Sequence, residues 1–346
     1  MTRSLCIALV SLMLSALAGS AVARETLRVL AWPGYADQDV VSEFEKRFDA
    51  EVHVTFVSSD DDLWNRIKAN KGGNFDVFAV NTAELQRYIA AGLAVPIDMQ
   101  DIPNGKNQLP RFRNLSTIPG LVHGGKVYAV PYTYSEMGLI YNRKLVKEPP
   151  ASMTAMWDPR YKNQVLAYDG SNHNFSLTAL SLGIRNPFML DERTFAQTLQ
   201  RLRLLRKNIG GLYSTPEEAV NKFREKPIAL LFANYGTQQV QALRKVGMDV
   251  GYVIPKEGAL AWLDCWTITA GAKNRALASA WINYTLSPAV SGLLPARQGL
   301  ANTIDAASSP STTDRDRLVW LEPVENFERR TFFWDRIRSG FQSGKF

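Results

Sequence analysis

The chain has few of the residues that build disulfide scaffolds and metal sites. Its 346 residues include only two cysteines and three histidines. Two cysteines cannot form a framework of several disulfides, and a Cys/His zinc cluster needs more ligands than this sequence offers close together. The sequence therefore excludes both classes of protein, and we expect neither a metal site nor a cofactor.

The chain also lacks long runs of charge or of apolar residues. Lysine and arginine number 40 against 33 aspartates and glutamates, a net charge of +7, yet no five consecutive residues carry the same charge. Nucleic-acid binders concentrate their positive charge, so we expect no nucleic acid partner. After residue 23 no stretch of 18 apolar residues occurs, which predicts that the mature chain is soluble and is not anchored by a helix.

Familiar catalytic motifs are missing as well. The sequence contains no G-x-S-x-G, no phosphate-binding P-loop and no H-E-x-x-H, and its histidines are 70 and 50 residues apart. We therefore expect a protein that is not an enzyme. Two alternatives stay open at this point. Cys265 could act as a nucleophile in an enzyme if a base lay beside it. Alternatively, the chain could bind an anion or a ferric complex, the latter with Tyr132 and Tyr134 as candidate ligands.

The first 23 residues have the features of a secretory signal. Arg3 precedes a short apolar stretch at 5–17, and Ala21-Val22-Ala23 forms an A-x-A cleavage site. The apolar stretch is shorter than the roughly 20 residues that span a bilayer. We therefore predict cleavage after Ala23 and a mature protein in the periplasm. Cleavage removes Cys6 and leaves Cys265 as the single thiol, so no intramolecular disulfide is expected.

Apart from this segment, the chain is long enough for more than one core, and 46% of its residues are hydrophobic. Strands and helices alternate every 20–30 residues, with helices predicted to begin after Asp37 and at a Thr82 cap, which is typical of an α/β fold with largely parallel sheets. The predicted strands are 26–32, 52–57, 75–80, 165–168, 228–232, 250–254 and 260–268.

The alternation restarts after Pro131, and no flexible linker separates the two halves. We therefore predict two lobes joined by crossing strands and able to hinge. The predicted N-terminal lobe comprises residues 24–132 and 258–302, and the C-terminal lobe comprises residues 133–257 and 303–346.

Aromatic and polar side chains gather at the carboxyl ends of these strands, where ligands bind in parallel α/β sheets. Trp262 and Asp264 are two residues apart on one strand and so share a face. A ring face attracts a cation and a carboxylate pairs with it, so this combination suits an organic ammonium. The candidate ligand-binding residues are Trp32, Tyr35, Asn81, Thr82, Asp169, Asn172, Asn234, Tyr235, Trp262 and Asp264.

The most specific motif of the sequence is Ile254-Pro255-Lys256-Glu257-Gly258 followed by Trp262-Leu263-Asp264. It resembles a motif of the periplasmic solute-binding proteins of ABC importers, particularly the spermidine/putrescine-binding branch, and the resemblance covers nearly all of the mature chain. It is also carried by the segments 30–35, 73–77, 130–132, 138–142, 157–162 and 272–274.

The resemblance implies a two-lobed, type II periplasmic binding protein fold. It also implies a monomer that delivers its solute to an inner-membrane ABC permease. The residues that the resemblance places in the cleft are Trp32, Tyr35, Trp262 and Asp264. Asp264 would bind an ammonium, and Asp169 would supply an acid from the second lobe.

Some positions depart from the family's pattern. Where the family has a second carboxylate beyond Asp169, this chain has Asn172 or Asn174. The family's tryptophan near residue 232 is Phe232 or Ala233 here, and its aromatic residue after the third strand is Ala83. Because an unpaired buried ammonium is costly, fewer acids favour a short ligand. We therefore expect the solute to be a polyamine or a related small amine or amino-acid-like compound.

Overall fold

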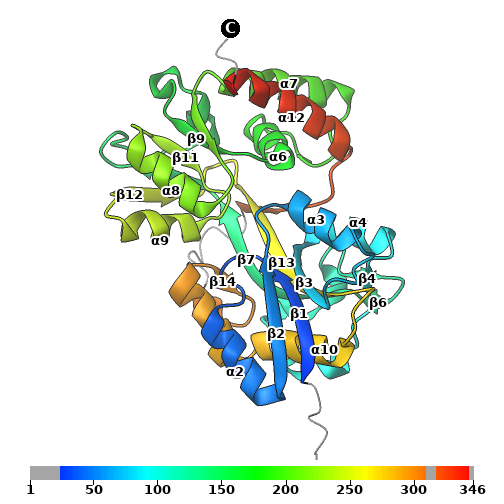
Figure 1. Cartoon of the computed structure of the whole chain (residues 1–346). Coiled ribbons are helices and arrows are strands. Elements are labelled where there is room, and N and C mark those ends of the chain that lie inside the picture. The colour runs from blue at the N-terminus through cyan, green and yellow to red at the C-terminus, as the bar shows by residue number, and fades with distance from the viewer. Residues whose placement is uncertain (1–23, 309–316, 343–346) are drawn as a thin grey trace, which may run out of the picture.

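The computed structural model describes residues 24–308 and 317–342. Two β-sheets, each with its own helices, form a lower and an upper lobe in Figure 1. The predicted signal segment, residues 1–23, lies outside the described residues. In the part of the chain that is described, no helix is long and apolar enough to cross a membrane.

The larger sheet has the strand order β14-β7-β13-β3-β1-β2, and β4 and β15 also pair with β13. β1 is parallel to β2 and β3, whereas β13 runs antiparallel to β3 and β7. The strands are β1 (Glu25–Ala31), β2 (Ala50–Phe56), β3 (Val77–Asn81), β4 (Ala94–Val95), β7 (Ala129–Met137), β13 (Ala259–Thr269), β14 (Ala301–Asn302) and β15 (Leu318–Trp320).

The smaller sheet has the strand order β10-β9-β11-β8-β12. β9 is parallel to both β10 and β11, and β8 is antiparallel to β11 and β12. The strands are β8 (Leu139–Asn142), β9 (Val165–Tyr168), β10 (Ile209–Tyr213), β11 (Leu230–Phe232) and β12 (Val250–Val253), and a separate hairpin joins β5 (Val122–His123) to β6 (Lys126–Val127).

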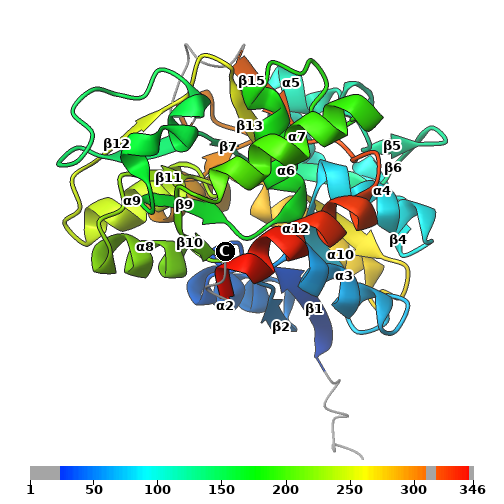
Figure 2. The same ribbon diagram turned by 90° about the horizontal axis from the view of Figure 1, so that it is seen from above.

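Helices cover both sheets, as Figures 1 and 2 show from two directions. The larger sheet carries α2 (Gln38–Phe48), α3 (Asp60–Lys68), α4 (Thr82–Ala90), α5 (Pro110–Arg113), α10 (Arg275–Thr285) and α11 (Pro288–Ser291). The smaller sheet carries α6 (Ser171–Ser181), α7 (Glu192–Leu205), α8 (Pro216–Glu225), α9 (Thr237–Lys245) and α12 (Phe327–Gln342).

The chain passes between the two sheets at several places. β7 continues into β8 through Gly138, β12 leads into β13, and β15 leads into α12, which packs against α6. A side chain at Gly138 would meet the backbone oxygen of Val253 at 2.5 Å, so this crossing needs glycine. β15 pairs with β13 in the larger sheet although its residues fall in the range predicted for the C-terminal lobe. The exact residues at which one lobe ends and the other begins stay a prediction.

Local sequence explains where the site-forming elements begin. The apolar runs predicted as strands are the buried strands β1, β3, β9, β11 and β13. The predicted cap at Thr82 is wrong by one residue, because Asn81 caps α4 and its side-chain oxygen accepts from the Glu84 amide at 2.9 Å. An amide side chain at the end of β3 thus serves as an N-cap, a role that Asn fills as well as Ser or Thr.

Candidate functional site

A cavity of about 330 Å³ lies between elements of the two sheets, and we call it the interlobe cavity. Its size is within the range of small-molecule sites. Seven of the ten candidate residues line it: Trp32, Tyr35, Asn81, Asn234, Tyr235, Trp262 and Asp264. They follow β1 or β11, end β3 or lie within β13, so elements of both sheets meet at this cavity.

Asp264 is the most deeply placed acid of this cavity. Only 7% of it is exposed, and one carboxylate oxygen accepts a hydrogen bond from the Tyr35 hydroxyl at 2.6 Å. Burial raises the pKa of Asp264 to about 7, the Tyr35 hydrogen bond lowers it, and the nearby charge of Asp60 raises it. Ionised Asp264 therefore lacks a full set of partners, and a bound cation would stabilise that state.

Aromatic rings surround this carboxylate. Trp262 lies on the same face of β13 as Asp264, and its indole N–H donates to the backbone oxygen of Asn234 in the other lobe at 3.0 Å. Tyr168 and Tyr235 from the smaller sheet meet edge to face with ring centroids 6.0 Å apart. The cavity thus has aromatic walls from both lobes and an acid between them, an arrangement that favours an organic cation.

Gly34 shapes the loop that presents Trp32 and Tyr35. Its φ is +88°, and a Cβ there would meet the Gln298 side chain at 2.4 Å. The positive φ favours glycine, whereas the flexible end of the Gln298 side chain is able to shift. The two rings on either side of Gly34 are thereby brought into the interlobe cavity.

Asp60 is a residue of this cavity that the sequence reasoning missed. It begins α3, just after the Ser59 N-cap, and its side-chain oxygen accepts from the Asn81 amide at 3.2 Å. Burial raises the pKa of Asp60, the charge of Arg87 lowers it, and Asp61 raises it. Three consecutive aspartates at 60–62 are typical of the first turn of a helix. The sequence alone therefore does not indicate that Asp60 faces the cleft.

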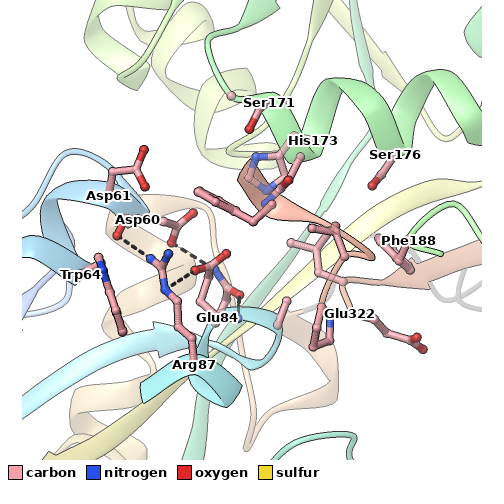
Figure 3. Close-up of a pocket in the computed structure, with 18 of the residues that line it drawn as sticks. Asp60, Asp61, Trp64, Glu84, Arg87, Ser171, His173, Ser176, Phe188 and Glu322 are labelled. Atoms are coloured by element: carbon pink, nitrogen blue, oxygen red, sulfur yellow. Dashed lines mark hydrogen bonds and ion pairs between the residues drawn. The ribbon is translucent and has the colours of Figure 1, made fainter. Parts of the chain in front are cut away.

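A second cavity, of about 600 Å³, adjoins the first and is called here the side cavity. The two share Asp60, Asn81, Tyr168 and His173 among their lining residues. Figure 3 shows Asp60, Glu84 and Arg87 of the lower lobe facing His173 and Ser171 of α6 across this space. Asp169 and Asn172, two of the candidate residues, line the side cavity rather than the interlobe cavity.

Asp169 is held by the C-terminal helix α12. One of its carboxylate oxygens accepts from the Trp334 indole N–H at 2.9 Å, and the other pairs with Arg338 at 3.2 Å. Both partners belong to the protein itself. The acid that the family resemblance assigned to the ligand therefore already has a cation beside it.

Glu84 and Arg87 form another internal pair in the side cavity. Their side chains are 2.8 Å apart, and the Arg87 guanidinium stacks on the Trp64 ring at 4.6 Å. Arg87 also donates to the backbone oxygen of Asp60 at 3.0 Å. Burial raises the pKa of Glu84, and Asp60 adds to that shift.

The remaining candidates lie away from the interlobe cavity. Thr82 is buried and lines a different groove, formed with Phe112 and Trp320. Cys265 is fully buried, its thiol pKa is raised by burial, and it packs in a core with Phe78 and Val80. Within residues 24–308 and 317–342, no group of three His, Cys, Asp or Glu side chains is arranged to hold a metal ion.

The sequence matches the family of bacterial extracellular solute-binding proteins over residues 39–313. The chain belongs to this family.

Characterised relatives narrow the comparison within the family. The chain is 25% identical over 269 residues to the spermidine/putrescine-binding periplasmic protein of Salmonella typhimurium, covering 77% of this chain and 74% of that protein. It is 26% identical over 351 residues to the putrescine-binding periplasmic protein PotF of Escherichia coli, covering 92% and 93%. The resemblance to the polyamine-binding branch is confirmed.

Solved structures share the fold. A putative spermidine/putrescine ABC transporter protein from Listeria monocytogenes matches with a TM-score of 0.79 and 22% identity, over 93% of this chain and 100% of that one. The protein MotA of Agrobacterium tumefaciens, solved with glucopine, matches with a TM-score of 0.73 and 15% identity, over 90% and 99%. The predicted two-lobed periplasmic binding protein fold is confirmed.

Proposed function

We propose that this protein is the periplasmic solute-binding component of an ABC importer, and that it captures a short organic amine in the interlobe cavity without transforming it. The cavity would release its solute to an inner-membrane permease. The mature protein would act as a monomer after cleavage behind Ala23. The family, the export-like N-terminal sequence and the polyamine-binding relatives support this function.

The charge of the cavity lining carries the proposal. Asp60, Glu217 and Asp264 line it, and no lysine or arginine occurs among the described residues that form its wall. His173 is the other titratable base there, and burial lowers its pKa to about 4, so it is neutral at pH 7. A cavity with acids and no competing cation attracts a cation and repels an anion.

The same observations weigh against the alternatives. An anion would have to lose its hydration beside Asp60 and Asp264 with no basic side chain in the lining to replace it. Tyr132 and Tyr134, which raised the possibility of a ferric site, pack in two different hydrophobic clusters. The buried Cys265 thiol, with its raised pKa, is a poor nucleophile because thiolates are the reactive form.

Isothermal titration calorimetry tests the proposal. The protein is unfolded and refolded to remove any bound solute, and then titrated at pH 8 with putrescine, spermidine, 4-aminobutyrate and ferric citrate. We expect putrescine to bind and ferric citrate not to bind. Binding of ferric citrate with no response to any amine would contradict the proposed function.

A further inference from the structure

The carboxylates around the two cavities differ in whether the protein already supplies them with a cation. Asp169 pairs with Arg338, and Glu84 pairs with Arg87. Asp60 and Asp264 have no lysine or arginine within ion-pairing distance among the described residues, although both line the interlobe cavity. Two buried or half-buried carboxylates that share no cation disfavour each other's ionised form.

Their positions show that the two acids share one small space. The cavity they line measures about 330 Å³, and the charge of Asp60 raises the pKa of Asp264. Tyr168 and Tyr235 line the same cavity, so Asp60 faces the aromatic wall of the opposite lobe. Burial raises the pKa values of both tyrosines, and the charge of Asp60 adds to this shift. Asp60 therefore lies inside the cleft rather than at the outer surface of α3.

Asn81 and Arg87 hold Asp60 in place, and the charge of Arg87 lowers the pKa of Asp60, which burial raises, without an ion pair between the two side chains. The Asn81 amide donates to one carboxylate oxygen while its own oxygen caps α4. Arg87 donates to the Asp60 backbone oxygen and keeps its ion pair with Glu84. This leaves carboxylate lone pairs of Asp60 available to a ligand, in an orientation that two helix starts hold in place.

A separate observation on the facing lobe also points to a cationic ligand. Asn234 lines the same cavity, is only 6% exposed, and its side-chain oxygen has no hydrogen-bond partner among the described residues. A buried amide oxygen without a donor is costly. An ammonium, which offers three N–H donors, would supply what Asn234 lacks.

We propose that Asp60 is a second cation-binding carboxylate of the cleft, so that the site selects a compound with two positive charges, one end at Asp264 and the other at Asp60. This inference rests on the proposed function and adds a class of solute to it. The second acid comes from α3 of the larger lobe, not from Asp169 of the smaller one. Glu217 also lines the cavity, but it is exposed to water, so its charge contributes less to the choice between ligands.

A pair of ligands that differ by one charge tests this assignment. The wild-type protein, Asp60→Asn and the control Asp61→Asn are titrated calorimetrically at pH 8 with putrescine and with n-butylamine. Asp61 is an exposed neighbour in the same helical turn, so its substitution removes the same charge outside the interlobe cavity. We expect the wild-type protein to bind putrescine at least about tenfold more tightly than n-butylamine, since a charge-assisted contact has about that effect.

In Asp60→Asn the affinity for putrescine should fall about tenfold or more while that for n-butylamine stays within about twofold. Retained n-butylamine binding also shows that the variant is folded. The Asp61→Asn control should keep the wild-type preference. An unchanged preference in Asp60→Asn, or equal wild-type affinities for the two amines, would overturn the assignment and leave the proposed function standing. No amine binding to the wild-type protein would overturn both.

Discussion

Asp264 and Asp169 belong to different lobes, Asp264 within β13 and Asp169 directly after β9, and their side chains have different partners. Asp264 has a phenol as its partner and is almost completely buried. Asp169 has an indole and a guanidinium, both from α12. On the proposed function, Asp264 is left for a cation from outside, whereas Asp169 contacts the C-terminal helix. A carboxylate at the cleft is then a ligand candidate only when the fold leaves it without a cation.

Removing the Asp264 charge should reduce the affinity for putrescine more than any other single substitution considered. In Asp264→Asn we expect the affinity for putrescine to fall about 10- to 100-fold, the range of a hydrogen bond to a charged group that is lost from a buried site. Asparagine keeps the shape of the side chain and can still accept from Tyr35. Calorimetric titration at pH 8 measures the change. An affinity equal to that of the wild-type protein would remove Asp264 from the site.

The stability of ligand-free Asp264→Asn provides an independent control. Because the pKa of Asp264 is raised from 3.8 to about 7 in the folded protein, ionisation of this group opposes folding. Its contribution to stability is present below pH 4 and is lost as the pH rises to about 7. At pH 8 the neutral variant should therefore be more stable, by about 2 kcal/mol after allowance for water in the cavity. Lower stability would indicate a structural role instead.

The pH dependence of binding tests whether the cation binds the ionised form of Asp264. An ammonium binds the ionised carboxylate, so binding must displace a proton from Asp264 below its pKa of about 7. The affinity of the wild-type protein should weaken by about tenfold per pH unit for each carboxylate that must lose a proton, and should level off above pH 7. Titrations from pH 5.5 to pH 8.5 measure this, and an affinity that rises toward acid pH would contradict it.

Asp169→Asn should have the smallest effect on binding. Because Asp169 is already paired and lines the side cavity, we expect the putrescine affinity to stay within about twofold of the wild-type value. The melting temperature should fall slightly, since the variant weakens contacts to Trp334 and to the partly exposed Arg338, which together contribute about 1 kcal/mol. A tenfold loss of affinity with unchanged stability would reverse the roles assigned to the two acids.

Local patterns predicted much of this architecture. Apolar runs identified the central strands, and the two-residue spacing of Trp262 and Asp264 placed both in one cavity. The restart of the alternation after Pro131 predicted two lobes, and the resemblance added the type II periplasmic binding protein fold. Those features depend on residues that are neighbours along the chain or on motifs that stay together.

Long-range contacts explain what the sequence did not predict. Asp60 belongs to the cleft because β3 places Asn81 beside the start of α3, 21 residues away along the chain. Asp169 is paired because α12 returns to the smaller lobe, 169 residues further on in the case of Arg338. No pattern of neighbouring residues in the sequence predicts either contact.

A crystal structure of the putrescine complex tests the central claim most directly. The account predicts that the diamine lies in the interlobe cavity among Trp32, Tyr35 and Trp262, with one nitrogen within hydrogen-bond distance of the Asp264 carboxylate. Putrescine bound at Asp169 in the side cavity, with Asp264 still contacting only Tyr35, would contradict it.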